Sequence, residues 1–238
     1  MAVFDHEARL RRVWRSRAGL YSSIAFVALA ALSALLLWTS GGGGDGATPL
    51  APPGESPPPT VTTTDHDLSI PVIAPETNWV VFNGVSVPDG ATKYGPLRSN
   101  GSAVAGFADT PRGALFAMAN ATVRRMLAGD DWKTVVNWEI APGAGTTQWL
   151  KERAQIQGPV SIPDPMQFAG FKFVFWTPQT AVIDWASRAA DGTLQMTTGT
   201  AVWQGGDWRL QLQADASDTA TQEPMSSLDG FVQWGASA

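Results

Sequence analysis

Few residues of this 238-residue chain are of a type that carries out chemistry. The chain has no Cys, and its two His, His6 and His66, come before the part with the composition of a folded domain. A Ser–His–Asp or Cys–His arrangement therefore lacks its base, and a zinc site lacks its usual ligands. No Gly-rich phosphate loop followed by Lys occurs either. These patterns indicate no catalytic, cofactor-binding or metal-binding residues.

Carboxylates are the remaining candidates for acid–base chemistry. Asp184 lies in TAVIDWASRAA, on the polar face of an expected strand, where a solvated or ion-paired side chain is the simpler interpretation. It is also the only candidate polar residue that the expected sheet offers to a ligand cup. Glu139 and Glu152 fall within expected helices, and their positions indicate surface acids.

The stretch FADTPRGALFAMANATVRRML, residues 107–127, could instead present a reactive Asp on a loop. Pro111 has a fixed φ and needs no N–H donor, so it suits the first position of a helix. The Pro that follows biases Thr110 towards extended backbone, as an N-cap requires. Asp109 adds a negative charge beside the positive end of the helix dipole, which is favourable. The stretch therefore predicts a helix start at Asp109, Thr110 and Pro111.

Other elements must surround this helix. WVVFNGVSVP, residues 79–88, indicates one strand or extended arm before it. Two shorter helices are expected after it, over residues 132–140 and 147–156. Their expected caps are Asp130 or Asp131, and Thr146.

Alternation with a period of two then predicts strands. In FKFVFW it places Phe171, Phe173 and Phe175 on one face, and three more strands are expected within residues 180–212. The turn signals Asp191-Gly192 and Gly205-Gly206 separate them. Helices followed by an antiparallel meander of four strands predict an α+β domain, with the helices on one face of the sheet.

Residues 20–38 form an uncharged stretch that predicts a transmembrane helix. A helix of this length spans roughly 28 Å, close to the hydrocarbon core of a bilayer. The expected anchor residues are Leu20, Tyr21, Ile24, Phe26, Val27, Leu29, Leu32, Leu35, Leu36, Leu37 and Trp38. The alternative is a cleaved signal peptide, but the apolar region is long and no small-x-small cleavage site follows it.

Positive charge on one side of this stretch sets the expected topology. The basic residues before it are Arg9, Arg11, Arg12, Arg15 and Arg17. No basic residue follows it until Lys93, so the N-terminus is expected in the cytoplasm and the rest outside.

The chain thus divides into four expected parts. Residues 1–19 form a basic cytoplasmic tail, and residues 20–38 form the membrane helix. Residues 39–76 form a disordered tether, because GGGGDG is flexible and PLAPPGESPPP favours extended polyproline II. Residues 77–238 form the extracytoplasmic α+β domain.

Several strings resemble a family of single-pass membrane proteins from conjugative and integrative elements of actinobacterial type. They are WVVFNGVSVP, GFADTPRGAL, FKFVFWTPQTAVIDWASRAADG and VWQGGDWRL. The order of anchor, tether, helices and sheet is also similar to the inner-membrane scaffold subunit of type IV secretion, as in TcpC-type conjugation proteins and Mce-associated membrane proteins. The resemblance implies a cone-like, nuclear-transport-factor-two-like domain, with about three helices packed on a curved antiparallel sheet of about four strands. It carries no catalytic residues over to this chain.

The expected function is that of a non-enzymatic, membrane-anchored assembly or scaffold protein of a conjugation or secretion apparatus. Its expected partners are other membrane or secretion-channel proteins, further copies of itself and the lipid bilayer. Nucleic acid is not expected, because from residue 77 eleven Lys and Arg face fourteen Asp and Glu. The alternatives are an extracytoplasmic domain that holds a small apolar ligand in an aromatic cup, and a small isomerase or hydratase on the same fold.

Overall fold

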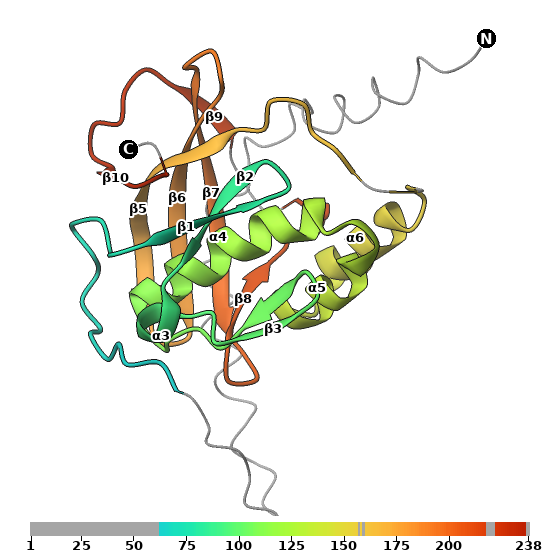
Figure 1. Cartoon of the computed structure of the whole chain (residues 1–238), viewed down its shortest axis with the longest axis horizontal. Coiled ribbons are helices and arrows are strands. Elements are labelled where there is room, and N and C mark those ends of the chain that lie inside the picture. The colour runs from blue at the N-terminus through green and yellow to red at the C-terminus, as the bar shows by residue number, and fades with distance from the viewer. Residues whose placement is uncertain (1–61, 157, 159, 218–221, 237–238) are drawn as a thin grey trace, which may run out of the picture. The chain divides into compact units, whose positions relative to one another are not determined.

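The computed structural model of the protein describes residues 62–156, 158, 160–217 and 222–236 (Figure 1). The helices are α3 (Ala91–Tyr94), α4 (Pro111–Leu127), α5 (Trp132–Glu139) and α6 (Ala144–Arg153), with a 3-10 turn η1 at Gly129–Asp131. The strands are β1 (Asn78–Phe82), β2 (Val85–Asp89), β3 (Arg98–Asn100), β4 (Ala103–Ala105), β5 (Gln167–Thr177), β6 (Thr180–Arg188), β7 (Leu194–Trp203), β8 (Trp208–Gln211), β9 (Gln222–Met225) and β10 (Val232–Gln233).

The largest layer is a six-stranded antiparallel sheet. Its strand order is β10-β5-β6-β7-β8, and β9 also pairs with β7. Strands β8 and β9 share one edge of β7, with β8 at the end that contains Trp203 and β9 at the end that contains Leu194. The strands β5 to β8 follow one another in sequence, whereas β9 and β10 come from the polar C-terminal stretch.

Helix α4 runs across this sheet and is covered on its other side as well (Figure 1). Thirteen of its seventeen residues are buried, including Asn120, which the helical wheel places opposite the apolar face. The Asn120 amide donates hydrogen bonds to Pro88 O at 2.9 Å and to Phe116 O at 3.0 Å. The β1–β2 hairpin therefore forms a second cover, and α4 is the central layer of the domain.

A β-hairpin replaces the single strand that the sequence predicts over residues 79–88. Strands β1 and β2 pair from Asn78↔Asp89 to Phe82↔Val85. Asn83 and Gly84 connect them with φ values of 47° and 89°, the left-handed conformation that a two-residue hairpin turn requires. The Asn83 amide also donates to Leu127 O at the end of α4, at 2.6 Å, which ties the hairpin to the helix.

The core is rich in aromatic rings. Trp234, next to β10, is only 2 % exposed and contacts five rings at centroid distances of 4.9 to 6.4 Å. These rings belong to Trp79, Phe116, Phe168, Phe171 and Trp185. The indole N–H of Trp234 donates to the Thr77 hydroxyl at 2.8 Å. The C-terminal stretch thus joins the start of β1 to the sheet.

A bulge in β5 changes the side-chain pattern that the sequence predicts. The register moves from Phe173↔Ile183 to Phe175↔Val182, so Val174 has no partner residue on β6. The extra residue reverses the alternation. Phe175 therefore points outward and is 51 % exposed, while Trp176 packs on the buried Trp208 with ring centroids 5.2 Å apart.

The expected side-chain caps do not form on the two shorter helices. Asp131 is the N-cap residue of α5, as expected, but its carboxylate accepts the N–H of Ser102 at 3.0 Å instead of one from the helix. Helix α6 begins at Ala144 with Gly143 as its N-cap, so Thr146 lies within its first turn, and the Thr146 hydroxyl donates to Ala141 O at 2.6 Å.

The expected fold class is corrected by these findings. The described residues form a mixed α/β structure with a six-stranded sheet and four helices, instead of about three helices on about four strands. None of these helices is both long enough and apolar enough to cross a membrane. The expected anchor at residues 20–38 and the five topology-setting Arg lie outside the described residues.

The junction before α4 yields a stability prediction. The buried Thr110 hydroxyl accepts the Gly113 N–H at 3.1 Å and donates to Asp65 Oδ2 at 2.7 Å. We expect Thr110→Ala to lower the free energy of unfolding by about 2 kcal/mol, since it removes a cap and deprives a buried carboxylate of its donor. Thermal melts would measure the loss. Thr147→Ala, which removes an exposed hydroxyl bonded to Gly143 O, is the control and should melt like the natural chain.

Candidate functional site

The start of α4 is a structural junction. Helix α4 begins at Pro111, Thr110 is its N-cap, and Asp109 lies exposed beside it. The segment of residues 62–76, assigned to the tether from the sequence, lies along this junction. Its Asp67 pairs with Arg112 at 3.0 Å, in addition to the Asp65–Thr110 bond. The carboxylates of Asp65 and Asp67 are thus engaged by Thr110 and Arg112, and Thr110 and Pro111 begin the helix as the sequence predicts.

Asp184 lies on the face of the sheet that is turned away from α4. Its neighbours across the sheet are Lys172 on β5 and Thr198 on β7. Lys172 Nζ lies 3.1 Å from the carboxylate, and the Thr198 hydroxyl donates to it at 2.7 Å. The adjacent Ile183 and Trp185 point the other way, into the core. Asp184 is therefore an ion-paired residue outside the space between the sheet and α4.

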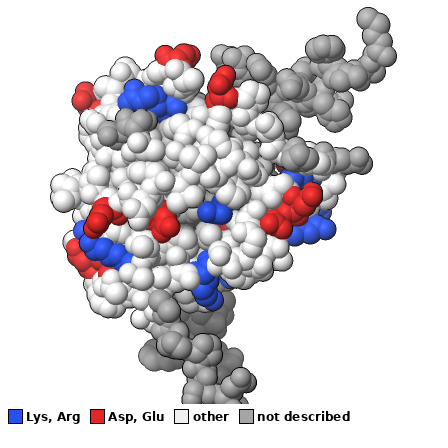
Figure 2. All heavy atoms as spheres, in the orientation of Figure 1, with Lys and Arg blue, Asp and Glu red and all other residues white. Residues whose placement is uncertain are grey.

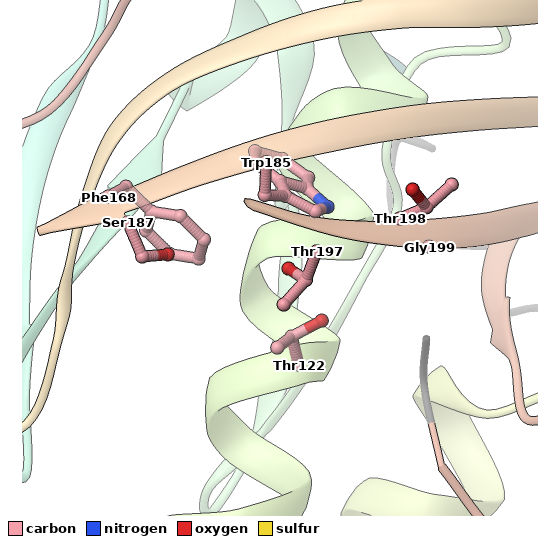
Figure 3. A pocket seen from close by; sticks show the side chains of 7 residues that line it. All are labelled: Thr122, Phe168, Trp185, Ser187, Thr197, Thr198 and Gly199. Carbon is pink, nitrogen blue, oxygen red and sulfur yellow. The ribbon is translucent and has the colours of Figure 1, made fainter. Parts of the chain in front are cut away.

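A small cavity of about 50 Å³ does lie between α4 and the sheet (Figure 3). Its lining consists of Thr122, Phe168, Trp185, Ser187, Thr197, Thr198 and Gly199. Figure 3 shows the indole nitrogen of Trp185 on the side of the ring that faces Thr197 and Thr198. This nitrogen is buried and has no hydrogen-bond partner among the described residues.

The chemistry of this cavity is limited to neutral hydrogen bonding. A space of this volume has room for about three or four water molecules, which would satisfy the indole N–H of Trp185. The lining contains no carboxylate, His or Lys, so none of its side chains is a general base with a suitable pKa. The sequence did not predict these hydroxyls, because Thr and Ser within strands give no local signal of a cavity.

Glu139 is the most strongly perturbed acid of the described residues. It is 3 % exposed, and its Oε1 accepts the N–H of Val104 at 2.9 Å. Burial raises its pKa to about 8, despite the opposing effects of that hydrogen bond and of Arg124. Its second oxygen has no partner among the described residues. Glu139 is therefore protonated at neutral pH, and the expectation of a surface acid is wrong.

The sequence contained a signal for this burial. Glu139 lies seven residues after Trp132, and three and four residues after Val136 and Val135, on one face of α5. Glu152, the other predicted surface acid, is exposed on α6 and accepts a hydrogen bond from Gln148 at 2.7 Å.

Asp207 is a second buried acid with a structural role. Its carboxylate accepts the N–H groups of Phe107 at 3.1 Å and Trp208 at 3.0 Å, and also that of Gly106. Arg98 lies 3.6 Å away. Burial raises its pKa, while the three backbone donors and Arg98 act in the opposite direction. Asp207 thus links the β7–β8 turn to the segment before α4.

Comparison with known proteins gives one match. A family model described as "Domain of unknown function (DUF8175)" matches residues 43–233, more than half of the chain. The chain belongs to the DUF8175 family. No curated protein and no solved structure matches it. The matched residues of this DUF8175 protein include the sheet, α4, Glu139, Asp184 and the cavity.

Potential metal ligands do not gather in the described part of this DUF8175 protein. Its His, Asp and Glu side chains there form no group of three or more that could hold an ion. The buried acids, Glu139 and Asp207, instead accept backbone N–H groups.

The buried state of Glu139 predicts an unusual pH dependence. The folded protein keeps the Glu139 proton up to about pH 8, whereas the unfolded chain loses it near the ordinary pKa of 4.5. The stabilisation is complete below the unfolded value and is lost as pH rises through the folded value, with a slope of at most about 1.4 kcal/mol per pH unit. Denaturant unfolding across this range would measure the decline.

Glu139→Gln should flatten this pH dependence, because the amide cannot ionise and still offers an oxygen to Val104 N–H. Glu152→Gln is the matched control and should keep the natural slope. Equal slopes in the natural protein and in Glu139→Gln would show that Glu139 does not hold its proton.

Proposed function

We propose that this chain is a non-enzymatic assembly protein, held at a membrane by residues 20–38, whose folded domain binds protein partners. The observation that carries the proposal is the edge of β5. Strand β10 pairs with β5 only at Gly170 and Phe171, and from Lys172 onward the described pairing partners of β5 lie on β6 alone. This half of β5 therefore has backbone groups available on one side (Figure 1).

Apolar side chains accompany this edge. Val174 is 56 % exposed and Phe175 is 51 % exposed, and the bulge turns Phe175 away from the core. An unpaired edge that also carries exposed apolar side chains is suited to bind an extended segment of another chain. The bulge and Lys172 limit indiscriminate pairing, so this edge favours a partner with a matching shape.

The packed interior of the domain favours binding of partners at its surface over binding of a ligand in an internal cup. Aromatic rings around Trp234 fill the space between the sheet and α4, and the cavity that remains there measures about 50 Å³. An isomerase or hydratase would need a general base inside that space, whereas Asp184 lies on the other face. Both alternatives are therefore less favoured than assembly.

The kind of assembly comes from the sequence resemblance alone. It suggests a conjugation or secretion apparatus, with other membrane or channel proteins and further copies of this chain as partners. The charge difference across residues 20–38 supports a cytoplasmic N-terminus and an extracytoplasmic domain. A tethered domain of this kind raises the local concentration of its partners at the membrane.

Replacing Phe175 tests the binding edge. We expect Phe175→Ser to reduce the amount of partner protein recovered after crosslinking in native membranes, because it removes an exposed apolar anchor. Quantitative mass spectrometry of the crosslinked complexes would measure the loss. Val72→Ser is the control and should change nothing, because Val72 is 81 % exposed but lies on the segment of residues 62–76, away from β5 in sequence.

Asp184→Asn separates assembly from catalysis in the same assay. It should leave partner recovery and any transfer activity nearly intact, whereas replacing a general base typically costs about 10²- to 10⁴-fold in rate. Loss of activity in Asp184→Asn at an unchanged melting temperature would contradict the proposal.

Labelling of introduced cysteines tests the topology, since the chain has no Cys of its own. In intact cells, a membrane-impermeant thiol reagent should label Gly44→Cys and leave Ala2→Cys unlabelled. Labelling of both after the cells are opened is the control. The reverse pattern in intact cells would overturn the proposed localisation.

A further inference from the structure

A second surface feature lies apart from the β5 edge. A groove of about 270 Å³ runs between the β1–β2 hairpin, the segment of residues 96–99 and α4, and no residue of β5 lines it. Its apolar walls include Val80, Val87, Leu97 and Val104, and its polar side chains include Asn120, Arg124 and Arg98. Arg98 is paired with Asp207 at 3.6 Å, so Arg124 is the cation of the groove that no ion pair between described residues engages. Figure 2 shows the face of the domain that carries β2, α4 and β3 as largely uncharged, with isolated charged side chains.

Arg124 is held in one orientation within this groove. Its Nε donates to Asn120 Oδ1 at 2.9 Å, and one terminal nitrogen donates to Ser102 O at 2.8 Å. The guanidinium also lies over the Phe82 ring, 4.5 Å from its centroid. Asn120 is fixed in turn by its bonds to Pro88 O and Phe116 O. A guanidinium held in this way loses little conformational entropy when it binds a further group.

The charge of Arg124 lacks a close counterion. None of the ion pairs between described residues includes it. Glu139 is the acid with the largest influence on it, but that side chain is neutral at pH 7. Asp89 also lines the groove and tempers the positive charge, while its Oδ1 accepts the N–H of Ala91 at 2.7 Å. The second terminal nitrogen of Arg124 makes no hydrogen bond to a described residue and is not enclosed.

We propose that this groove is a second partner-binding site, in which Arg124 pairs with the carboxylate of an Asp or Glu side chain on a partner protein. The planar guanidinium matches a carboxylate, and the apolar walls match the methylene groups and the neighbours of that side chain. The inference rests on the proposed role in protein binding and adds the chemistry of the contact.

A protein is favoured over a small free acid by the surface around the groove. Val80, on the wall, is 47 % exposed. A small acid bound at Arg124 would leave this apolar wall in water, whereas a protein partner would cover it.

Two peptides that differ only in charge test the site in the full-length protein in detergent micelles. Calorimetric titration should show acetyl-Val-Glu-Val-amide binding about tenfold more tightly than acetyl-Val-Gln-Val-amide, because only the former brings a carboxylate to the guanidinium. Arg124→Gln should abolish that preference. Arg112→Gln is the matched control, since Arg112 pairs with Asp67 outside the groove, and it should keep the preference.

Arg124→Gln also removes the hydrogen bond to Ser102 O and could prevent folding, so a second variant provides an independent test. Val80→Asp adds a negative charge on the exposed wall and should reverse the preference, with little effect on the melting temperature. Equal affinity of the natural protein for the two peptides would overturn the proposal, as would a preference that persists in Val80→Asp. Hexanoate binding as tightly as the Glu peptide would instead identify a site for small acids and overturn the choice of partner.

The two binding sites fail independently in these experiments. Phe175→Ser should leave the preference for the Glu peptide unchanged, because Phe175 does not line the groove. Unchanged partner recovery in Phe175→Ser, with an intact preference for the Glu peptide, would contradict only the proposed function of β5. Absence of the preference, with partner recovery still sensitive to Phe175→Ser, would contradict only the groove.

Discussion

Helix α4 is buried on two sides, and this constraint shapes the rest of the domain. A helix with one apolar stripe can rest on a sheet and face water on its other side. Helix α4 is apolar or small over most of its circumference, and its polar Asn120 is 1 % exposed. It therefore needs a second cover. The close approach of the chain before α4 depends on Gly113, where an added Cβ would lie 1.8 Å from Ala108 O.

The second cover explains the parts of the fold that sequence periodicity did not predict. A helix and alternating strands can be recognised from local patterns, and this was enough to locate α4 and the strands β5 to β8. The β1–β2 and β3–β4 hairpins are short and contribute little periodicity, although Asn83-Gly84 was a usable turn signal. The bond from Thr110 to Asp65 joins residues 45 positions apart, and no local pattern could indicate it.

A single bulge decides which surface the sheet presents. Strict alternation would have buried Phe175 and exposed Trp176, so that the edge would carry an indole ring and the core a phenyl ring. Because Val174 is an extra residue in β5, Phe175 is exposed and Trp176 packs inward. Composition cannot place such a bulge, because the same letters fit both registers. The position of Asp184 shows the same limit, because alternation predicts which residues of a strand share a face but not which face of the sheet α4 covers.

The same burial controls the electrostatics around α4. Taking a carboxylate out of water is costly unless it is neutralised or receives several donors, and the domain uses both solutions. Asp207 receives three backbone N–H groups, whereas Glu139 receives one and keeps its proton. A neutral Glu139 cannot compensate Arg124, although the two side chains influence each other. The guanidinium charge is then directed to the groove by the contacts that fix it to Asn120 and Ser102. A positive charge at the surface of an acidic domain is thus a consequence of how its central helix is covered.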